Sequence, residues 1–286
     1  MRNNLKKIFL LISDLHQRDA SAFISEFEAL GGRIDGIVYV NNQSTFRKIF
    51  RDMGHFNDFM RALHKICSRI YAHIRHLNTL ENLERSWSIR GENSWDLLPP
   101  GVNLKQYSKN NHIRFHRINK ICPSTIDKIR GKEPAIFVFY SGGILKGPVL
   151  DTTSNEFIIS HMGSVPRYRG MNVVEWAYLE NHPLEVSVMV IDSGIDSGDI
   201  LDKYPIDIKN AQTIAGLRKS GYETGVKATA RAILDYSQGK LERKSQQGSA
   251  RYYYRMHDDL REKILQKLKQ QAPNSSPQMV SAVRIE

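Results

Sequence analysis

An almost unbroken apolar run at residues 135–140 limits the folds open to this chain. A strand without polar alternation needs apolar neighbours on both faces, as strands in the middle of a parallel sheet have. The start of the chain agrees, because an apolar run at residues 7–12 precedes helically spaced apolar residues and then a β-branched run at residues 37–40. The sequence therefore predicts an α/β fold with a Rossmann-like, mostly parallel sheet and helices on both faces.

The periodicity also predicts how the chain is organised around this sheet. We expect further strands or extended segments at residues 113–118, 157–160, 186–191 and 200–208, and helices at residues 123–129, 213–236 and 258–270. A long helical insertion is predicted at about residues 41–99, with Lys and Arg between its apolar positions. We expect these to form a solvated face, with a basic rim for an anionic substrate as the alternative. The chain divides into an α/β domain, residues 1–208, and a C-terminal helical extension, residues 209–286.

Composition and charge narrow the class of protein. Hydrophobic residues at 41% and charged residues at 25% exclude wholesale disorder and a collagen-like repeat. The net charge of +11 favours anionic partners such as nucleic acid, nucleotides, phosphorylated sugars or a polyglutamylated cofactor. No stretch approaches the roughly 20 apolar residues of a spanning helix, so we expect no membrane span and a cytoplasmic location. Cys67 and Cys122 lack a CxxC partner, and we expect neither a disulfide framework nor a metal site.

Residues suited to catalysis concentrate between residues 141 and 198. His161 follows the predicted strand at residues 157–160, and the carboxyl end of such a strand is where ligands usually bind. The next strand leads into a loop that contains three carboxylates and two glycines: Asp192, Gly194, Asp196, Gly198 and Asp199. If the two strands are neighbours, His161 and one aspartate converge across the crevice. Taken singly, each of these residues fits a structural or turn role as well.

Three blocks of sequence together resemble a known family. They are, in order, Gly142-Gly143-Ile144-Leu145, then His161 with Pro166-Arg167-Tyr168-Arg169-Gly170, then residues 192–201. In this order and spacing they are similar to the formyltransferases that use N10-formyltetrahydrofolate. That family includes methionyl-tRNA formyltransferase, glycinamide ribonucleotide transformylase and the sugar N-formyltransferases.

The resemblance implies a role for each matching residue. His161 would be the catalytic histidine and Asp196 the catalytic aspartate, with N10-formyltetrahydrofolate as the formyl donor. The implied cofactor-binding residues are Gly142, Gly143, Ile144, Leu145, Asp192, Gly194, Ile195 and Gly198. The implied substrate-side and loop residues are Ile159, Gly163, Pro166, Arg167, Arg169 and Gly170. A positioned imidazole can donate to the oxyanion, and a carboxylate can orient it or accept the proton of an attacking amine.

Two positions depart from the family pattern. Ile159 stands where the family has Asn, and Gly163 stands where it has Ser. Isoleucine cannot donate a hydrogen bond, and loss of one oxyanion donor typically lowers the rate by about 10² to 10³. Ser160 is adjacent, but alternation along a strand predicts that it points to the opposite face.

The implied acceptor is a primary amine of a nucleotide-linked amino sugar. Helices added to the N-terminal domain resemble the sugar enzymes, and the extension has a helical pattern where tRNA-formylating members carry a β-barrel. The alternatives are a catalytically impaired folate- or nucleotide-binding pseudoenzyme and a formyltetrahydrofolate hydrolase, with a methionyl-tRNA formyltransferase or an RNA binder less favoured. We expect a small-molecule partner and no specific nucleic acid, and we leave a homodimer open. We expect residues 252–254 to pack a tail helix onto the domain, with base stacking as the alternative.

Overall fold

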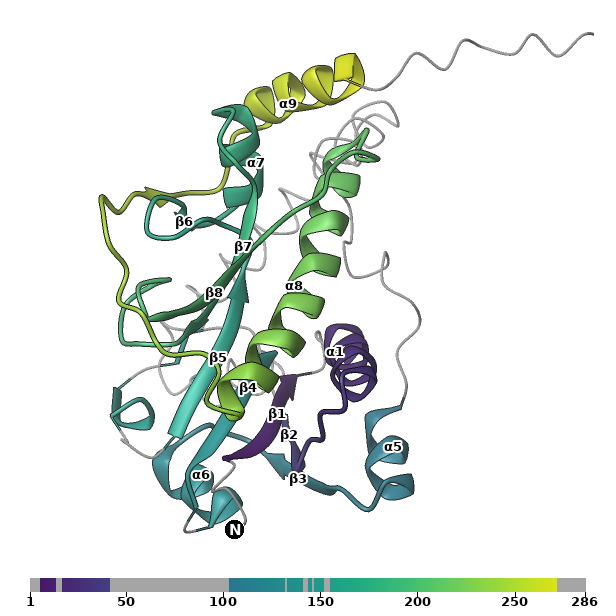
Figure 1. The fold of residues 1–286 in the computed structure, drawn as a ribbon, viewed down its shortest axis with the longest axis vertical. Helices are drawn as coiled ribbons and strands as arrows, with labels where there is room; N and C mark the ends of the chain where they lie inside the picture. The colour runs from purple at the N-terminus through teal and green to yellow at the C-terminus, as the bar shows by residue number, and fades with distance from the viewer. Residues whose placement is uncertain are drawn as a thin grey trace, which may run out of the picture.

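The computed structural model describes residues 6–13, 17–41, 103–131, 133–140, 144–145, 147–151 and 155–271. The predicted helical insertion lies, beyond Asn41, outside the described residues, as do Gly142, Gly143 and Cys67. The centre of the described fold is a seven-stranded sheet in the order β3-β2-β1-β4-β5-β7-β8 (Figure 1).

The sheet is mostly parallel, which confirms the predicted fold class. Its strands are β1 (Lys7–Ser13), β2 (Gly36–Val40), β3 (Arg114–Ile118), β4 (Ala135–Tyr140), β5 (Asn155–His161), β7 (Glu185–Val190) and β8 (Ile200–Pro205). Strands β1 to β5 pair in parallel, whereas β7 is antiparallel to both β5 and β8. The apolar run at residues 135–140 forms β4, the middle strand of the sheet.

Helices cover both faces of the sheet. They are α1 (Gln17–Ala29), α5 (Leu104–Asn110), α6 (Pro123–Arg130), α7 (Val173–Leu179), α8 (Ile214–Ser237) and α9 (Asp258–Gln271), with a short 3₁₀ turn, η3 (Gly147–Val149). Helices α1 and α8 lie side by side (Figure 1). Their side chains share one buried core with Leu10 and Ile136. On the other face, Phe137 stacks between Phe9 and Phe157, at centroid distances of 5.2 and 5.1 Å, and α6 packs against this row. Alternate residues of one strand therefore fill two separate cores.

Helix α8 lies close against the strand that ends in His161. Thr213 caps the helix by accepting a hydrogen bond from the Gly216 N–H (3.0 Å). A Cβ atom on Gly225 would lie 3.4 Å from Ser160 Oγ, so this part of the helix faces Ser160 at van der Waals distance. The predicted division between residues 208 and 209 stays a prediction.

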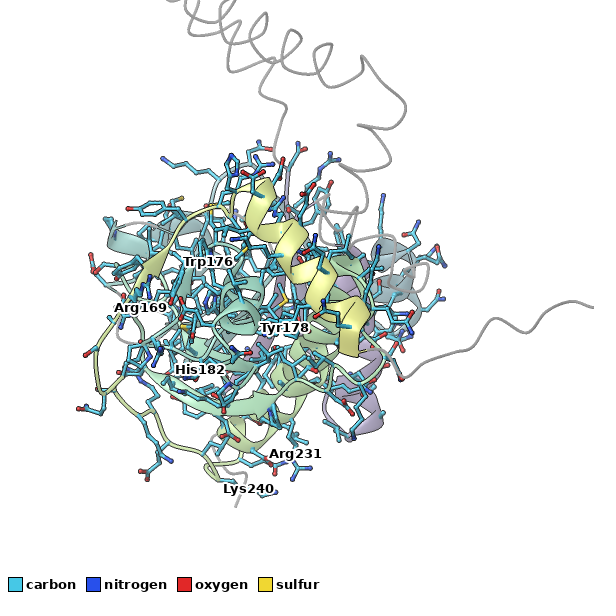
Figure 2. All side chains as sticks on the ribbon, turned by 90° about the horizontal axis from the view of Figure 1, so that it is seen from above. Arg169, Trp176, Tyr178, His182, Arg231 and Lys240 are labelled. Atoms are coloured by element: carbon cyan, nitrogen blue, oxygen red, sulfur yellow. The ribbon has the colours of Figure 1, made fainter. Side chains whose placement is uncertain are left out.

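The chain after α8 returns to the region of β6 (Arg169–Gly170). It pairs there through β9 (Tyr252–Tyr253), and α9 follows and packs on α7 (Figures 1 and 2). Tyr253 is buried against Tyr168 and Trp176, as predicted for a packed tail, whereas Tyr252 and Tyr254 are exposed. Among the described helices, none combines the length and the apolar character that a membrane crossing requires.

Candidate active site

His161 is the last residue of β5 and points away from α8. Ile159 packs with the core beneath α6, whereas Ser160 Oγ lies toward Gly225 of α8. His161 is two residues from Ile159, so alternation places both on the same face of the strand. The prediction that Ser160 points to the opposite face is therefore confirmed, and its hydroxyl does not replace a donor at position 159.

The two ring nitrogens of His161 have different partners. Nε2 lies 2.8 Å from the backbone oxygen of Tyr168, and Nδ1 lies 3.6 Å from Oδ1 of Asp196. A carbonyl oxygen only accepts, so Nε2 carries a proton, and Nδ1 is the nitrogen that faces the carboxylate. The side chains are 11% and 20% exposed, so the pair is largely shielded from water.

Asp196 lies beside His161 as predicted, but the chain brings it there in a different way from the one we expected. We expected two neighbouring strands to end at one crevice, but β7 runs antiparallel to β5 and ends beside Ile158. The loop between β7 and β8 instead folds back over the sheet. Gly198 makes this possible, because a Cβ atom there would lie 1.8 Å from the backbone oxygen of Val190. The Asp192 carboxylate closes the loop by accepting from the Ser197 hydroxyl (2.7 Å).

The folded-back loop forms one wall of an apolar cleft that is open to solvent. The cleft is lined by Phe139, Ile144, Leu145, Ile159, Met189, Val190, Ile191, Asp192, Gly194, Ile195, Asp196, Ser197 and Gly198. All predicted cofactor-binding residues that the structure describes are in this group. Among these lining residues, the only side-chain donor is the Ser197 hydroxyl, and it is used by Asp192. Ile159 therefore presents an apolar wall where the family pattern has an amide.

Gly163 is required by the position of the histidine ring. A Cβ atom at this position would lie 2.8 Å from His161 Nε2 and 2.6 Å from the Tyr168 oxygen. Real Cβ atoms do not approach other heavy atoms this closely, so the hydrogen bond between the ring and the carbonyl occupies the space of a side chain. The absence of the family's Ser thus has a local steric reason.

The segment after Gly163 contributes backbone groups and anchors to the site. The Gly170 N–H donates to Asp196 Oδ2 (2.8 Å), which orients the carboxylate. Tyr168 is fully buried; burial and its hydrogen bond to Glu180 raise the pKa of its hydroxyl, which therefore remains a donor to Glu180. Two predicted residues lie apart from the pair: Arg167 is more than half exposed and lies 3.8 Å from Glu180, and the Pro166 oxygen accepts from the Arg251 N–H.

Two contacts at the site could not be found from the sequence. One is the Tyr168 carbonyl, which has no side-chain signature. The other is Gln246, whose amide contacts both the Asp196 loop and Arg169. Asp199 has a different role, because Arg243 and Ser245 occupy its carboxylate. Within the described part of the chain, no three His, Cys, Asp or Glu side chains are arranged to hold a metal ion.

Comparison with protein families agrees with this geometry. Residues 105–233 match the model of a family described as formyl transferase. The family predicted from the three sequence blocks is thereby confirmed, and this part of the chain is a formyltransferase domain. The matched residues include His161, Asp196 and all the residues that line the cleft.

Individual relatives are distant and cover the chain unequally. A methionyl-tRNA formyltransferase from Geobacter sulfurreducens is 28% identical over 160 residues, 55% of this chain and 50% of the relative. The chain thus spans about half the length of this curated relative. Similar solved structures include an N-formyltransferase from Helicobacter canadensis in complex with folinic acid and dTDP-3-aminofucose, at 18% identity and a TM-score of 0.49, covering 88% of this chain and 71% of that one. Another is glycinamide ribonucleotide transformylase 1 from Symbiobacterium toebii, at 12% identity and a TM-score of 0.49, covering 83% and 90%.

Proposed function

We propose that this chain transfers a formyl group from N10-formyltetrahydrofolate to a primary amine of a nucleotide-linked amino sugar. The observation that carries the proposal is the contact between His161 and Asp196, since Asp196 also lines the apolar cleft of a formyltransferase domain. A proton-accepting pair beside an apolar cleft suits an acyl transfer in which an amine must lose a proton.

The lining of the cleft supports the proposal that it binds the reduced pterin ring of this donor. A flat ring needs apolar walls, which Ile144, Leu145 and Ile159 supply, and polar groups along its edges. On the loop side, Gly194 and Gly198 have no room for a Cβ atom, so backbone forms much of that wall. When bound, the folate supplies the formyl carbon.

His161 and Asp196 would manage the protons of the reaction. Nε2 of His161 donates to Tyr168, so Nδ1 is the nitrogen that takes up and releases a proton. Oδ2 of Asp196 is held by Gly170, and Oδ1 faces Nδ1. The 3.6 Å between these atoms is longer than a direct hydrogen bond, which leaves both able to accept from an amine. Once protonated, Nδ1 can donate to the oxyanion that develops when the amine attacks the formyl carbon, while Asp196 stabilises the positive charge of the imidazolium. The same proton can then pass to the folate nitrogen as its bond to the formyl carbon breaks.

The charge of the chain supports a phosphate-bearing small molecule as the acceptor. The net charge of +11 favours a substrate that carries a diphosphate.

Ile159 favours a second candidate, a protein that binds folate or nucleotide without turnover. The cleft wall at this position offers no hydrogen-bond donor to an oxyanion. In that case the cleft would bind the folate, and the missing donor, which typically changes a rate by about 10² to 10³, would leave no detectable transfer.

A substrate panel tests these proposals. The chain and its Asp196→Asn variant are incubated with N10-formyltetrahydrofolate and nucleotide-linked amino sugars, with methionyl-tRNA, or without an amine. Mass spectrometry detects formylated product, and a coupled assay detects formate. Formylation of an amino sugar by the unmodified chain alone supports the proposal. Formate without an amine indicates a hydrolase, calorimetric folate binding without either product indicates the second candidate, and transfer to methionyl-tRNA alone contradicts the proposed acceptor.

A further inference from the structure

The side chain of Gln246 joins two parts of the site that are distant in sequence. Its Nε2 donates to the backbone oxygens of Asp196 (3.0 Å) and Gly198 (2.8 Å). Its Oε1 accepts from Nε (3.1 Å) and Nη2 (2.6 Å) of Arg169. One amide group thus uses both of its N–H donors and accepts two further hydrogen bonds.

These partners fix which way the amide points. The Arg169 guanidinium can only donate, so the atom beside it must be the amide oxygen. The two loop carbonyls can only accept, so the NH₂ group must face them. A glutamate at position 246 would keep the acceptors for Arg169 but would place a carboxylate oxygen against both carbonyls.

The backbone at Asp196 needs external support. Its φ angle is +51°, in the left-handed region, where a residue other than glycine is strained. Such a conformation persists only when surrounding contacts fix it. Gln246 fixes the carbonyl of Asp196 itself, and through Arg169 it also holds the residue next to Gly170, whose N–H orients the carboxylate.

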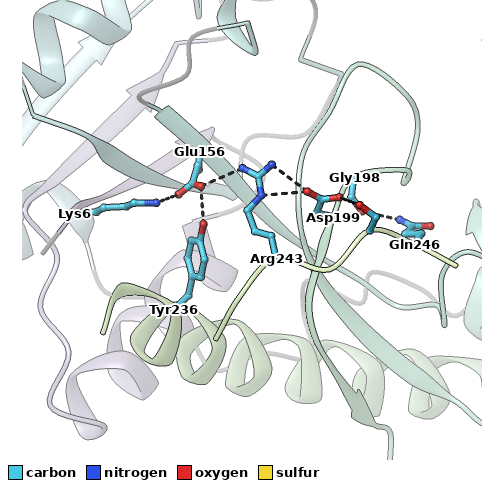
Figure 3. Close-up of polar contacts among 8 residues, drawn as sticks. Lys6, Glu156, Gly198, Asp199, Tyr236, Arg243 and Gln246 are labelled. Atoms are coloured by element: carbon cyan, nitrogen blue, oxygen red, sulfur yellow. Dashed lines mark hydrogen bonds and ion pairs between the residues drawn. The ribbon is translucent and has the colours of Figure 1, made fainter. Parts of the chain in front are cut away.

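Gln246 is itself held in place by the segment around it, residues 238–251, which we call the strap. Lys244 exchanges two backbone hydrogen bonds with Ile200 (2.9 and 2.8 Å), and the Arg251 N–H donates to Pro166 (3.2 Å). Figure 3 shows Gln246 beside Gly198, and Figure 2 shows the strap running from Lys240 toward Arg169. Gln246 therefore lies between two anchored points.

We propose that Gln246 is a positioning residue for Asp196. Its side chain holds the backbone of the Asp196 loop and the Arg169 guanidinium. In this arrangement Oδ2 of Asp196 accepts from the Gly170 N–H, and Oδ1 of Asp196 faces His161. Gln246 acts through Asp196 and does not itself contact the reacting atoms. Its effect on the rate rests on the proposed function.

The test compares Gln246→Glu with Gln247→Glu, the same chemical change one residue along the strap at an exposed position. Gln246→Glu keeps the acceptors for Arg169 and loses both donors to the loop. We expect its kcat to fall by about 100-fold, as for a small misplacement of a catalytic group, with little change in the KM for the acceptor amine. Gln247→Glu should match the unmodified chain. If Gln246→Glu does not fold, Gln246→Met, which is similar in size and uncharged, replaces it.

A second readout does not depend on activity. Hydrogen exchange of the Gly170 amide, followed by NMR, reports its bond to Asp196. We expect faster exchange in the Gln246 variant and no change in Gln247→Glu. Unchanged exchange with unchanged kcat in a folded Gln246 variant overturns the proposal. If the unmodified chain transfers no formyl group, the proposed function fails, and the Gly170 exchange alone decides whether Gln246 holds Asp196.

Discussion

The two ends of strand β5 carry charged groups that differ in how fully their hydrogen-bonding capacity is used. At the amino end, Glu156 is bonded by Lys6, by the Tyr236 hydroxyl (2.6 Å) and by Arg243 (3.3 Å), and Arg243 continues to Asp199 (Figure 3). At the carboxyl end, His161 and Asp196 face each other across 3.6 Å beside an apolar cleft. A carboxylate with several close partners stabilises the fold, whereas a pair with unused hydrogen-bonding capacity can act on a ligand.

Removing the imidazole should have the largest effect. We expect His161→Ala to lower kcat by about 10³-fold, because the site loses its proton-accepting nitrogen and its oxyanion donor together. Steady-state kinetics with the best acceptor from the panel measure this. His257→Ala is the control, since that side chain is 76% exposed and lies just before α9. A similar loss in both variants, or in neither, would contradict the role of His161.

Two aspartates in one loop allow a carboxylate of the candidate active site to be compared directly with a carboxylate that stabilises the fold. Asp196→Asn should lower kcat by about 10²-fold, because a neutral amide stabilises the imidazolium poorly. Asp199→Asn removes the same charge three residues away, from a carboxylate already held by Arg243 and Ser245. It should reduce the melting temperature and leave kcat largely unchanged. Equal kinetic losses in the two variants would mean that the loop acts as a whole and that Asp196 has no special part.

The Glu156 cluster should govern stability and its dependence on pH. Burial alone would raise the pKa of Glu156, but hydrogen bonds from Lys6, Tyr236 and Arg243 outweigh it and hold the pKa below its usual range. A lowered pKa in the folded state stabilises the protein above the unfolded-state pKa, and this contribution is lost as the pH falls through the folded-state value.

We therefore expect Glu156→Gln to lower the free energy of unfolding by about 2 kcal/mol at neutral pH and to flatten its decline in acid. Urea unfolding at several pH values measures both effects, and kcat should not change. The control is Glu133→Gln, at an exposed surface ion pair with Lys7. A fall in kcat without a loss of stability in Glu156→Gln would mean that the amino end of β5 serves the reaction rather than the stability of the fold.

The sequence predicts the frame of the molecule better than it predicts the contacts of the site. Burial on both faces leaves unbroken apolar runs, so β1, β2 and β4 were predicted within a residue or two. The antiparallel direction of β7 was not, because pairing direction depends on loop geometry rather than on strand composition. Helix α5 was missed because it is short and mostly polar. The Tyr168 carbonyl and Gln246 were also missed, since backbone groups and distant amides have no pattern along the chain.

The smallest expected effect tests the apolar wall at the carboxyl end of β5. Ile159→Asn introduces an amide donor on the face that His161 shares, beside the cleft. We expect kcat to rise by about 10-fold or more, since one oxyanion donor is worth up to 10² to 10³ in ideal geometry, and stability to fall because the amide is part-buried without a ligand. Ile159→Val, which stays apolar, is the control and should leave kcat unchanged. A folded Ile159→Asn variant with unchanged kcat would mean that the Ile159 wall does not limit the reaction, and that the site at His161 works without a donor there.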